Sequence, residues 1–206
     1  MKYTEYTIGY REFPDEISLL INISGCPNNC KGCHSEYLRQ DIGTELTTDV
    51  LDELIKNNDG ITCIGFMGGD QDKQYVVKLS QYIKEKYKYL HTGWYSGQNT
   101  FPLYHGTFDY IKLGPYIEEL GPIDNPSTNQ RMYLNVSNDE LNAQFTDITE
   151  YAFWAPKPWD VDYFDYMEEK EKHKTDLNQN NSENNWYKSE NDINCIKYTY
   201  FLETLR

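Results

Sequence analysis

The sequence predicts an α/β protein built on a parallel sheet, and the alternation of two hydrophobic patterns carries this prediction. Short apolar runs of strand length alternate along the chain with stretches in which apolar residues recur at helical spacing. Strands that alternate with helices favour right-handed crossovers and a parallel sheet, which is either open and doubly wound or closed into a full or partial barrel. In all of these folds, binding sites lie where the carboxyl ends of the strands meet.

The first two predicted elements are a strand and a helix. Residues 17–23 alternate between apolar and mostly polar positions, which is typical of a strand. A helix is expected over residues 47–60, because Thr47 and Thr48 are N-cap candidates and Gly60 is suited to end it. A loop with several cysteines therefore begins at the carboxyl end of the first strand.

The later elements repeat this order. A nearly continuous apolar run over residues 61–67 indicates a strand buried on both faces, and Gly68 and Gly69 end it. A second helix is expected in residues 73–90, and the segments "HTGWYSG" and "FDYIKLG" each contain a further short strand. The "MGGD" turn thus lies, like the cysteine loop, after the carboxyl end of a strand.

The composition changes near residue 160 and predicts two parts. Residues 1–160 form the α/β domain, and residues 161–206 form an acidic, Asn-rich C-terminal extension that is partly disordered. Residues 168–194 contain too few aliphatic side chains to offset the entropy of ordering them. The apolar tail after them, residues 195–206, is a candidate to dock back on the domain.

Charge and hydropathy exclude several functions. The formal charge is −14 and the pI is near 4.6, whereas binding to phosphate backbones or anionic membranes needs clustered Lys and Arg. The N-terminus has no apolar signal region, and no run approaches the roughly 18 apolar residues of a transmembrane helix. The sequence predicts a cytoplasmic protein without a nucleic-acid or membrane partner.

Three of the five cysteines lie close together in a C-x3-C-x2-C motif formed by Cys26, Cys30 and Cys33. This crowding is poor geometry for a disulfide framework, so reduced thiols that bind a metal are expected. Three thiolates on one loop can hold three irons of a cubane and leave the fourth iron open. Structural zinc is the alternative and needs a fourth ligand from elsewhere. Cys63 is expected to be a small buried apolar residue.

The cysteine motif and the "MGGD" turn together resemble the radical S-adenosylmethionine superfamily. The resemblance implies a partial, open β/α barrel with a 4Fe-4S cluster on Cys26, Cys30 and Cys33. S-adenosylmethionine would bind the open iron through the amino and carboxylate groups of its methionine. Reductive cleavage of this cofactor would yield methionine and a 5′-deoxyadenosyl radical.

A narrower resemblance covers residues 13–133. The segments "FPDEISLLINISGCPNNCKGCHS", "FMGGD", "GWYSG" and "DYIKLGPYIEELGPIDNPSTNQRMY" are similar to the activating enzymes of anaerobic ribonucleoside-triphosphate reductase. These oxidoreductases are glycyl-radical activases. The resemblance implies that the chain abstracts hydrogen from a glycine of the large reductase subunit, with reduced flavodoxin or ferredoxin as the electron donor.

The resemblance also implies cofactor-binding residues. Gly32 and His34 would contact the adenine of S-adenosylmethionine, while Gly68 and Gly69 would let the backbone approach its methionine end. Asp70 would receive or orient the cofactor's amino group, although the superfamily more commonly has Glu at this position.

Other implied contacts lie further along the chain. A polar side chain in residues 92–96 is a candidate to meet the cofactor. Tyr116, Asn129, Gln130 and Arg131 are candidates to contact the protein partner or substrate, and Arg131 is suited to pair with a carboxylate.

Two alternatives to this activase hypothesis stay open. The same chemistry would serve another glycyl-radical enzyme or a small-molecule substrate such as a pterin-derived precursor. A non-catalytic, zinc-binding interaction module would instead contain zinc and would not respond to S-adenosylmethionine.

Overall fold

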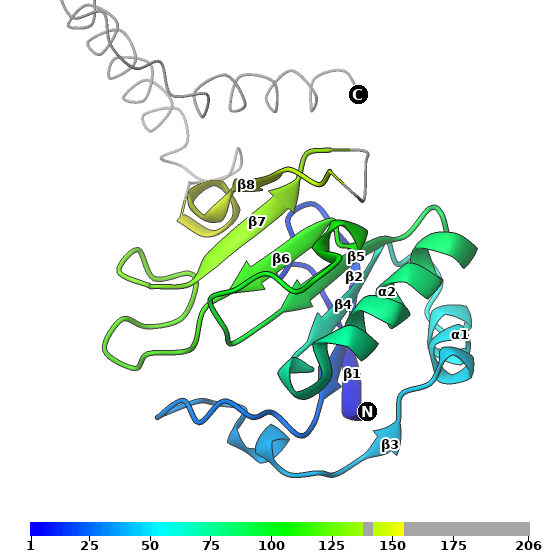
Figure 1. Cartoon of the computed structure of the whole chain (residues 1–206), viewed down its shortest axis with the longest axis horizontal. Coiled ribbons are helices and arrows are strands. Elements are labelled where there is room, and N and C mark those ends of the chain that lie inside the picture. The colour runs from blue at the N-terminus through cyan, green and yellow to red at the C-terminus, as the bar shows by residue number, and fades with distance from the viewer. Residues whose placement is uncertain (138–141, 155–206) are drawn as a thin grey trace, which may run out of the picture. The chain divides into compact units, whose positions relative to one another are not determined.

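In the described part of the chain, eight strands form one mixed sheet in the order β3-β1-β2-β4-β5-β6-β7-β8 (Figure 1). The strands are β1 (Lys2–Gly9), β2 (Ser18–Ile23), β3 (Thr44–Glu45), β4 (Cys63–Met67), β5 (His91–Tyr95), β6 (Tyr110–Leu113), β7 (Arg131–Asn135) and β8 (Phe145–Asp147). The computed structural model describes residues 1–137 and 142–154. Predictions for the extension, residues 161–206, and for the boundary near residue 160 lie outside the described residues.

The four central strands are parallel, as the sequence predicts. β2 pairs with β4, β4 with β5, and β5 with β6, all in parallel register. Antiparallel strands extend this core on both sides: β1 and β3 next to β2, and β7 and β8 next to β6. The described residues therefore form a mixed sheet, and the partial barrel stays a prediction.

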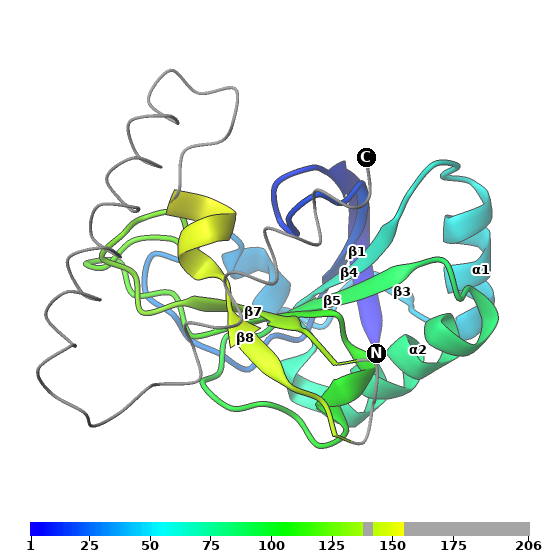
Figure 2. The ribbon, with the colours of Figure 1, turned by 90° about the horizontal axis from the view of Figure 1, so that it is seen from above.

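Two helices, α1 (Thr48–Lys56) and α2 (Lys73–Lys86), cover one face of the sheet (Figure 2). Both begin at the capping side chains of polar residues: Thr47 accepts a hydrogen bond from the Val50 amide, and Asp72 accepts one from the Tyr75 amide. Their apolar sides pack on the strands in one buried core that includes Ile21, Phe66, Trp94 and Ile111 among its strand residues.

The connection from β5 to β6 contains the short 3-10 turn η3 (His105–Thr107) in place of a third helix. Gly97, Pro102 and Gly106 interrupt this segment, which disfavours a helix. Three further turns are η1 (Glu36–Arg39), η2 (Asp70–Asp72) and the π-helical η4 (Glu150–Trp154).

Phe13 covers the opposite face of the sheet. Its side chain is fully buried, and its ring lies against Gly65 and Gly93 on the two central strands. A Cβ at Gly93 would lie 2.3 Å from the Phe13 ring, so only glycine leaves room for it. The ring also makes an edge contact with Tyr95 at a centroid distance of 5.3 Å. The segment between β1 and β2 is thereby fixed over the middle of the sheet.

Candidate functional site

The cysteine loop, residues 25–39, leaves the carboxyl end of β2 and is closed at its base. The Gly25 amide donates to the Gln40 carbonyl at 3.0 Å, and the Cys26 amide donates to the Leu38 carbonyl at 2.9 Å. The Arg39 guanidinium donates to the Cys30 carbonyl from inside the loop. These backbone contacts hold both ends of the loop at the edge of the sheet.

All three loop cysteines are free, half-buried thiols. Burial raises the pKa of the Cys26 thiol, and the negative charges of Asp70, Cys30 and Cys33 raise it further. Among the described residues, no three Cys, His, Asp or Glu side chains form a group that could hold a metal ion. Each thiolate of a cubane binds a different iron, so a cluster does not require the sulfurs to converge on one point.

The glycine turn after β4 has the backbone conformation that its sequence predicts. Gly68 has φ 105° and Gly69 has φ 97°, which is the left-handed region that side chains disfavour. The Gly68 carbonyl accepts a hydrogen bond from the Trp94 indole at 2.7 Å. A Cβ at Gly69 would lie 2.5 Å from the Val76 side chain. The turn is therefore fixed between α2 and β5.

Asp70 joins three elements at this edge. Its carboxylate accepts hydrogen bonds from the Ser96 hydroxyl at 2.6 Å, from the Gly97 amide at 2.8 Å, and from the Asn28 side-chain amide at 2.6 Å. Asp70 is buried, with 8% of its surface exposed. The family resemblance implies that Asp70 receives or orients the cofactor's amino group, and this role stays a prediction. In the structure, protein donors take up most of the accepting capacity of its carboxylate.

Lys112, which the sequence analysis does not single out, is a buried cation at the same edge. Its ammonium carries three N–H donors, yet among the described residues it donates to one acceptor, the Gly114 carbonyl at 3.0 Å. Burial lowers the pKa of Lys112 to about 8, while the negative charges of Asp70, Cys30 and Cys33 act in the opposite direction. A lysine inside the apolar run of "DYIKLG" is the one signal that would have indicated it.

Two predicted adenine contacts lie on the outer part of the cysteine loop. Gly32 has φ 70°, and a Cβ there would lie 3.0 Å from the Glu118 side chain. Glu118 also pairs with Lys31 at 3.2 Å, so the "GPYIEEL" segment lies beside the loop. His34 is exposed, and Tyr116, a predicted partner contact, is half-buried.

The other predicted partner contacts make internal bonds at the start of β7. The Arg131 guanidinium donates to the Thr128 carbonyl at 2.8 Å and lies 3.6 Å from the Asp147 carboxylate. Gln130 is buried, and the Asn129 amide donates to the Pro115 carbonyl at 3.0 Å. The Asn129 carbonyl oxygen is buried without a hydrogen-bond partner in the described part of the chain.

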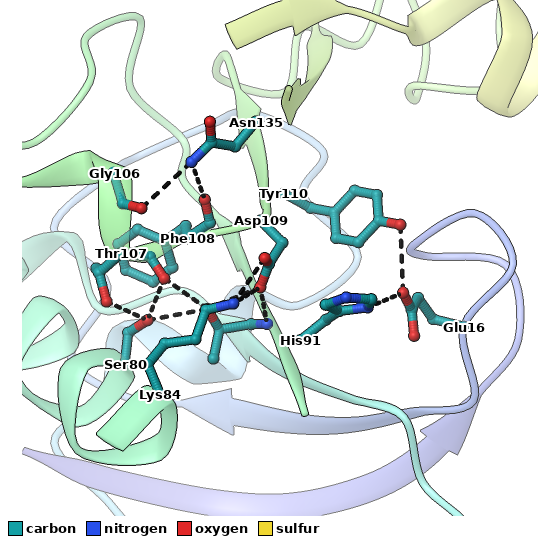
Figure 3. A network of polar contacts seen from close by, with 11 residues as sticks. Glu16, Ser80, Lys84, His91, Gly106, Thr107, Phe108, Asp109, Tyr110 and Asn135 are labelled. Carbon is teal, nitrogen blue, oxygen red and sulfur yellow. Dashed lines mark hydrogen bonds and ion pairs between the residues drawn. The ribbon is translucent and has the colours of Figure 1, made fainter. Parts of the chain in front are cut away.

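A second polar network lies at the opposite, amino edge of the parallel strands (Figure 3). Glu16 binds His91 at 2.5 Å and accepts a bond from the Tyr110 hydroxyl at 3.2 Å. Lys84 and Asp109 form an ion pair at 2.6 Å. The sheet thus has polar residues at both ends, and the three loop cysteines lie at the carboxyl edge.

Comparison with known proteins gives one match. Residues 15–112 match the family model of a 4Fe-4S single cluster domain, which is a little under half of the chain. No curated protein and no solved structure matches the chain. The matched segment runs from β2 to β6 and contains the three loop cysteines, Asp70 and Lys112.

The match supports a 4Fe-4S cluster in this protein, and the donor set fits one. Three free thiols on one loop can each bind an iron of a cubane. Cys63, by contrast, is fully buried within β4, as expected, and burial raises its pKa well above the ordinary value. Cys195 lies outside the described residues. No helix in the part of the chain that the structure describes is long and apolar enough to cross a membrane.

Proposed function

We propose that this protein is a radical S-adenosylmethionine enzyme that installs a glycyl radical on anaerobic ribonucleoside-triphosphate reductase. The observation that carries the proposal is the single loop with three free thiols at the carboxyl edge of a parallel sheet, inside a segment that matches a 4Fe-4S domain. A cluster held by three thiolates keeps one iron for a further ligand. When bound, such a cluster supplies the electron that cleaves the sulfonium of S-adenosylmethionine.

The residues around the loop suit the methionine end of that cofactor. Lys112 is a buried cation that lies 5.6 Å from the Tyr95 ring centroid and has one hydrogen-bond acceptor among the described residues, and a carboxylate is the group that such an ammonium binds best. Gly68 and Gly69 hold the left-handed backbone conformation of the turn at the end of β4, which brings their backbone groups to the carboxyl edge. In this arrangement Lys112 holds the cofactor's carboxylate, and the glycine turn accepts its amino group.

The proposed protein substrate follows from the narrower sequence resemblance in residues 13–133. A radical formed at this edge has to be kept from water, which a docked partner does by covering the site. The half-exposed cysteine loop and the adjacent "GPYIEEL" segment lie together at the edge where such a partner would dock. Reduced flavodoxin or ferredoxin remains the proposed electron donor.

The first test is anaerobic reconstitution with iron and sulfide, followed by electron paramagnetic resonance of the reduced protein with and without S-adenosylmethionine. We expect a 4Fe-4S signal that changes when the cofactor is added, together with release of 5′-deoxyadenosine. A protein that binds zinc, or a cluster that ignores the cofactor, would contradict the proposal.

The second test identifies the target. The reconstituted protein is mixed with the large reductase subunit, a reductant and S-adenosylmethionine, and the glycyl-radical signal is recorded. Cofactor cleavage without this signal would favour another glycyl-radical enzyme or a small-molecule substrate.

A further inference from the structure

The side chain of Asn28 connects the cysteine loop to the rest of the site. Asn28 lies between Cys26 and Cys30, and its amide donates to the Asp70 carboxylate at 2.6 Å. The same carboxylate oxygen accepts the Gly97 amide at 2.8 Å, and the other oxygen accepts the Ser96 hydroxyl at 2.6 Å. One buried carboxylate therefore fixes the loop to the ends of both β4 and β5.

The surroundings of this contact are shaped to fit it. A Cβ at Gly97 would lie 2.4 Å from the Asn28 side-chain nitrogen, so any other residue at this position would push Asn28 away. Ser96 is itself fixed, because its amide donates to the Lys112 carbonyl at 2.8 Å. The acceptor is thus rigid and the donor lies on the loop.

We propose that Asn28, Asp70, Ser96 and Gly97 form a latch that orders the cysteine loop before a cluster binds. Asp70 acts in it as a positioning residue. The proposal rests on the cluster site of the proposed function but not on the activase reaction. A loop held in place loses less conformational entropy when its thiolates bind the cluster, so the latch slows loss of the cluster.

The latch depends on the amide at position 28, which allows a sharp test. Asn28→Asp keeps the size of the side chain but places a carboxylate against Asp70, which removes the hydrogen bond and adds repulsion. Asn29→Asp is the matched control. It makes the same chemical change one residue away, where the side chain is exposed and has no hydrogen-bond partner among the described residues.

The first measurement uses the protein without a cluster. Hydrogen exchange of the peptide covering residues 25–35 should be about tenfold faster, or more, in Asn28→Asp than in the wild type, and unchanged in Asn29→Asp. Exchange in α2 serves as the internal reference for the fold. Equal exchange in the two variants would overturn the latch.

The second measurement follows the reconstituted protein. Iron release to a chelator should be faster by a similar factor in Asn28→Asp, and the reduced-cluster spectrum should broaden. In the Asp70→Ala background the carboxylate at position 28 has no neighbouring charge to repel it, so Asn28→Asp should speed iron release much less there than in the wild type. Equal acceleration of iron release in both backgrounds would contradict the proposal.

These readouts separate the two proposals. If the wild type takes up no cluster, the proposed function fails, while hydrogen exchange still decides whether the latch exists. If the cluster forms but S-adenosylmethionine has no effect, the proposed activase function fails, while iron release still tests the latch.

Discussion

The two edges of the parallel sheet use polar residues in different ways. At the amino edge, the Ser80 hydroxyl lies 3.0 Å from the Thr92 hydroxyl and 3.1 Å from the Thr107 hydroxyl, and Asp109 binds both Lys84 and the Thr92 amide. At the carboxyl edge, Lys112 makes one hydrogen bond within the described residues, and the three loop thiols are half-buried. Apart from the buried Ser18 hydroxyl, the described polar groups of the amino edge bind one another, whereas the Lys112 ammonium at the carboxyl edge has N–H donors left over.

This difference separates structural from functional polar residues in one sheet. Buried polar groups that bind one another stabilise the fold and have little capacity left for a ligand. Buried charges with unused donors cost stability, and they are typical of binding sites. We therefore expect changes at the amino edge to lower stability, and changes at the carboxyl edge to remove cluster or cofactor binding.

The largest effect is expected for Cys33→Ala. Loss of one of three thiolates leaves an iron without its protein ligand, so the iron content after reconstitution should fall close to background. Cys63→Ala is the matched control, because Cys63 is fully buried within β4 and should leave the iron content unchanged. Iron and sulfide analysis decides the result, and an unchanged content in Cys33→Ala would refute the assignment.

Lys112→Met should bring opposite changes in stability and binding. The folded pKa of about 8 lies below the ordinary 10.5, so protonating Lys112 costs stability at neutral pH. The variant should raise the free energy of unfolding near pH 7 by roughly 2 kcal/mol. It should also abolish the spectral response to S-adenosylmethionine.

The pH dependence gives an independent check of Lys112. Between about pH 8 and 10.5, Lys112 holds its proton more tightly in the unfolded chain than in the folded one. The free energy of unfolding of the wild type should therefore include a contribution that increases with pH across this window. The free energy of unfolding of Lys112→Met, measured with urea, should lack this contribution. Lys31→Met, at an exposed position in the cysteine loop, is the control and should retain it.

Asp109→Ala tests the amino edge. This carboxylate pairs with Lys84 at 2.6 Å and accepts the Thr92 amide at 2.7 Å, and the substitution leaves both donors without it. The free energy of unfolding should fall by about 2 kcal/mol, whereas the iron content stays unchanged. The exposed Asp59→Ala serves as the control for loss of an acidic residue. Loss of the cluster in Asp109→Ala would break the division between the two edges.

The sequence predicts the parallel core because strand-length segments alternate with helical patterns, and the nearly continuous apolar run of β4 signals burial on both faces. The sequence does not predict β1. Its segment "KYTEYTIG" is largely polar, because its side chains are only partly buried. Topology alone places the cysteine loop and the glycine turn at one edge. The contact of Asn28 with Asp70 joins residues 42 positions apart, and no local pattern encodes such a pair.

The smallest effect is expected at the Glu16–His91 pair. The hydrogen bond that His91 donates to the Glu16 carboxylate raises the pKa of His91. Burial acts to raise the pKa of Glu16, but the bonds from His91, Thr62 and Tyr110 outweigh it and lower this pKa. The contribution of the His91 charge to stability is fully present below the ordinary histidine pKa of 6.5 and is lost as pH rises through the raised pKa. The contribution of the Glu16 charge is fully present above the ordinary glutamate pKa of 4.5 and is lost as pH falls through the lowered pKa.

His91→Gln should therefore lose stability relative to the wild type near pH 6 and lose less near pH 9. The difference should stay below about 1 kcal/mol, because His91 is half-exposed and solvent screens the pair. Asp109 and Lys84 also act on His91 with opposite signs, so the comparison is made with both residues intact. Urea unfolding at the two pH values measures it. A variant that lost equal stability at both would show that packing against Tyr110, rather than charge, is what His91 contributes.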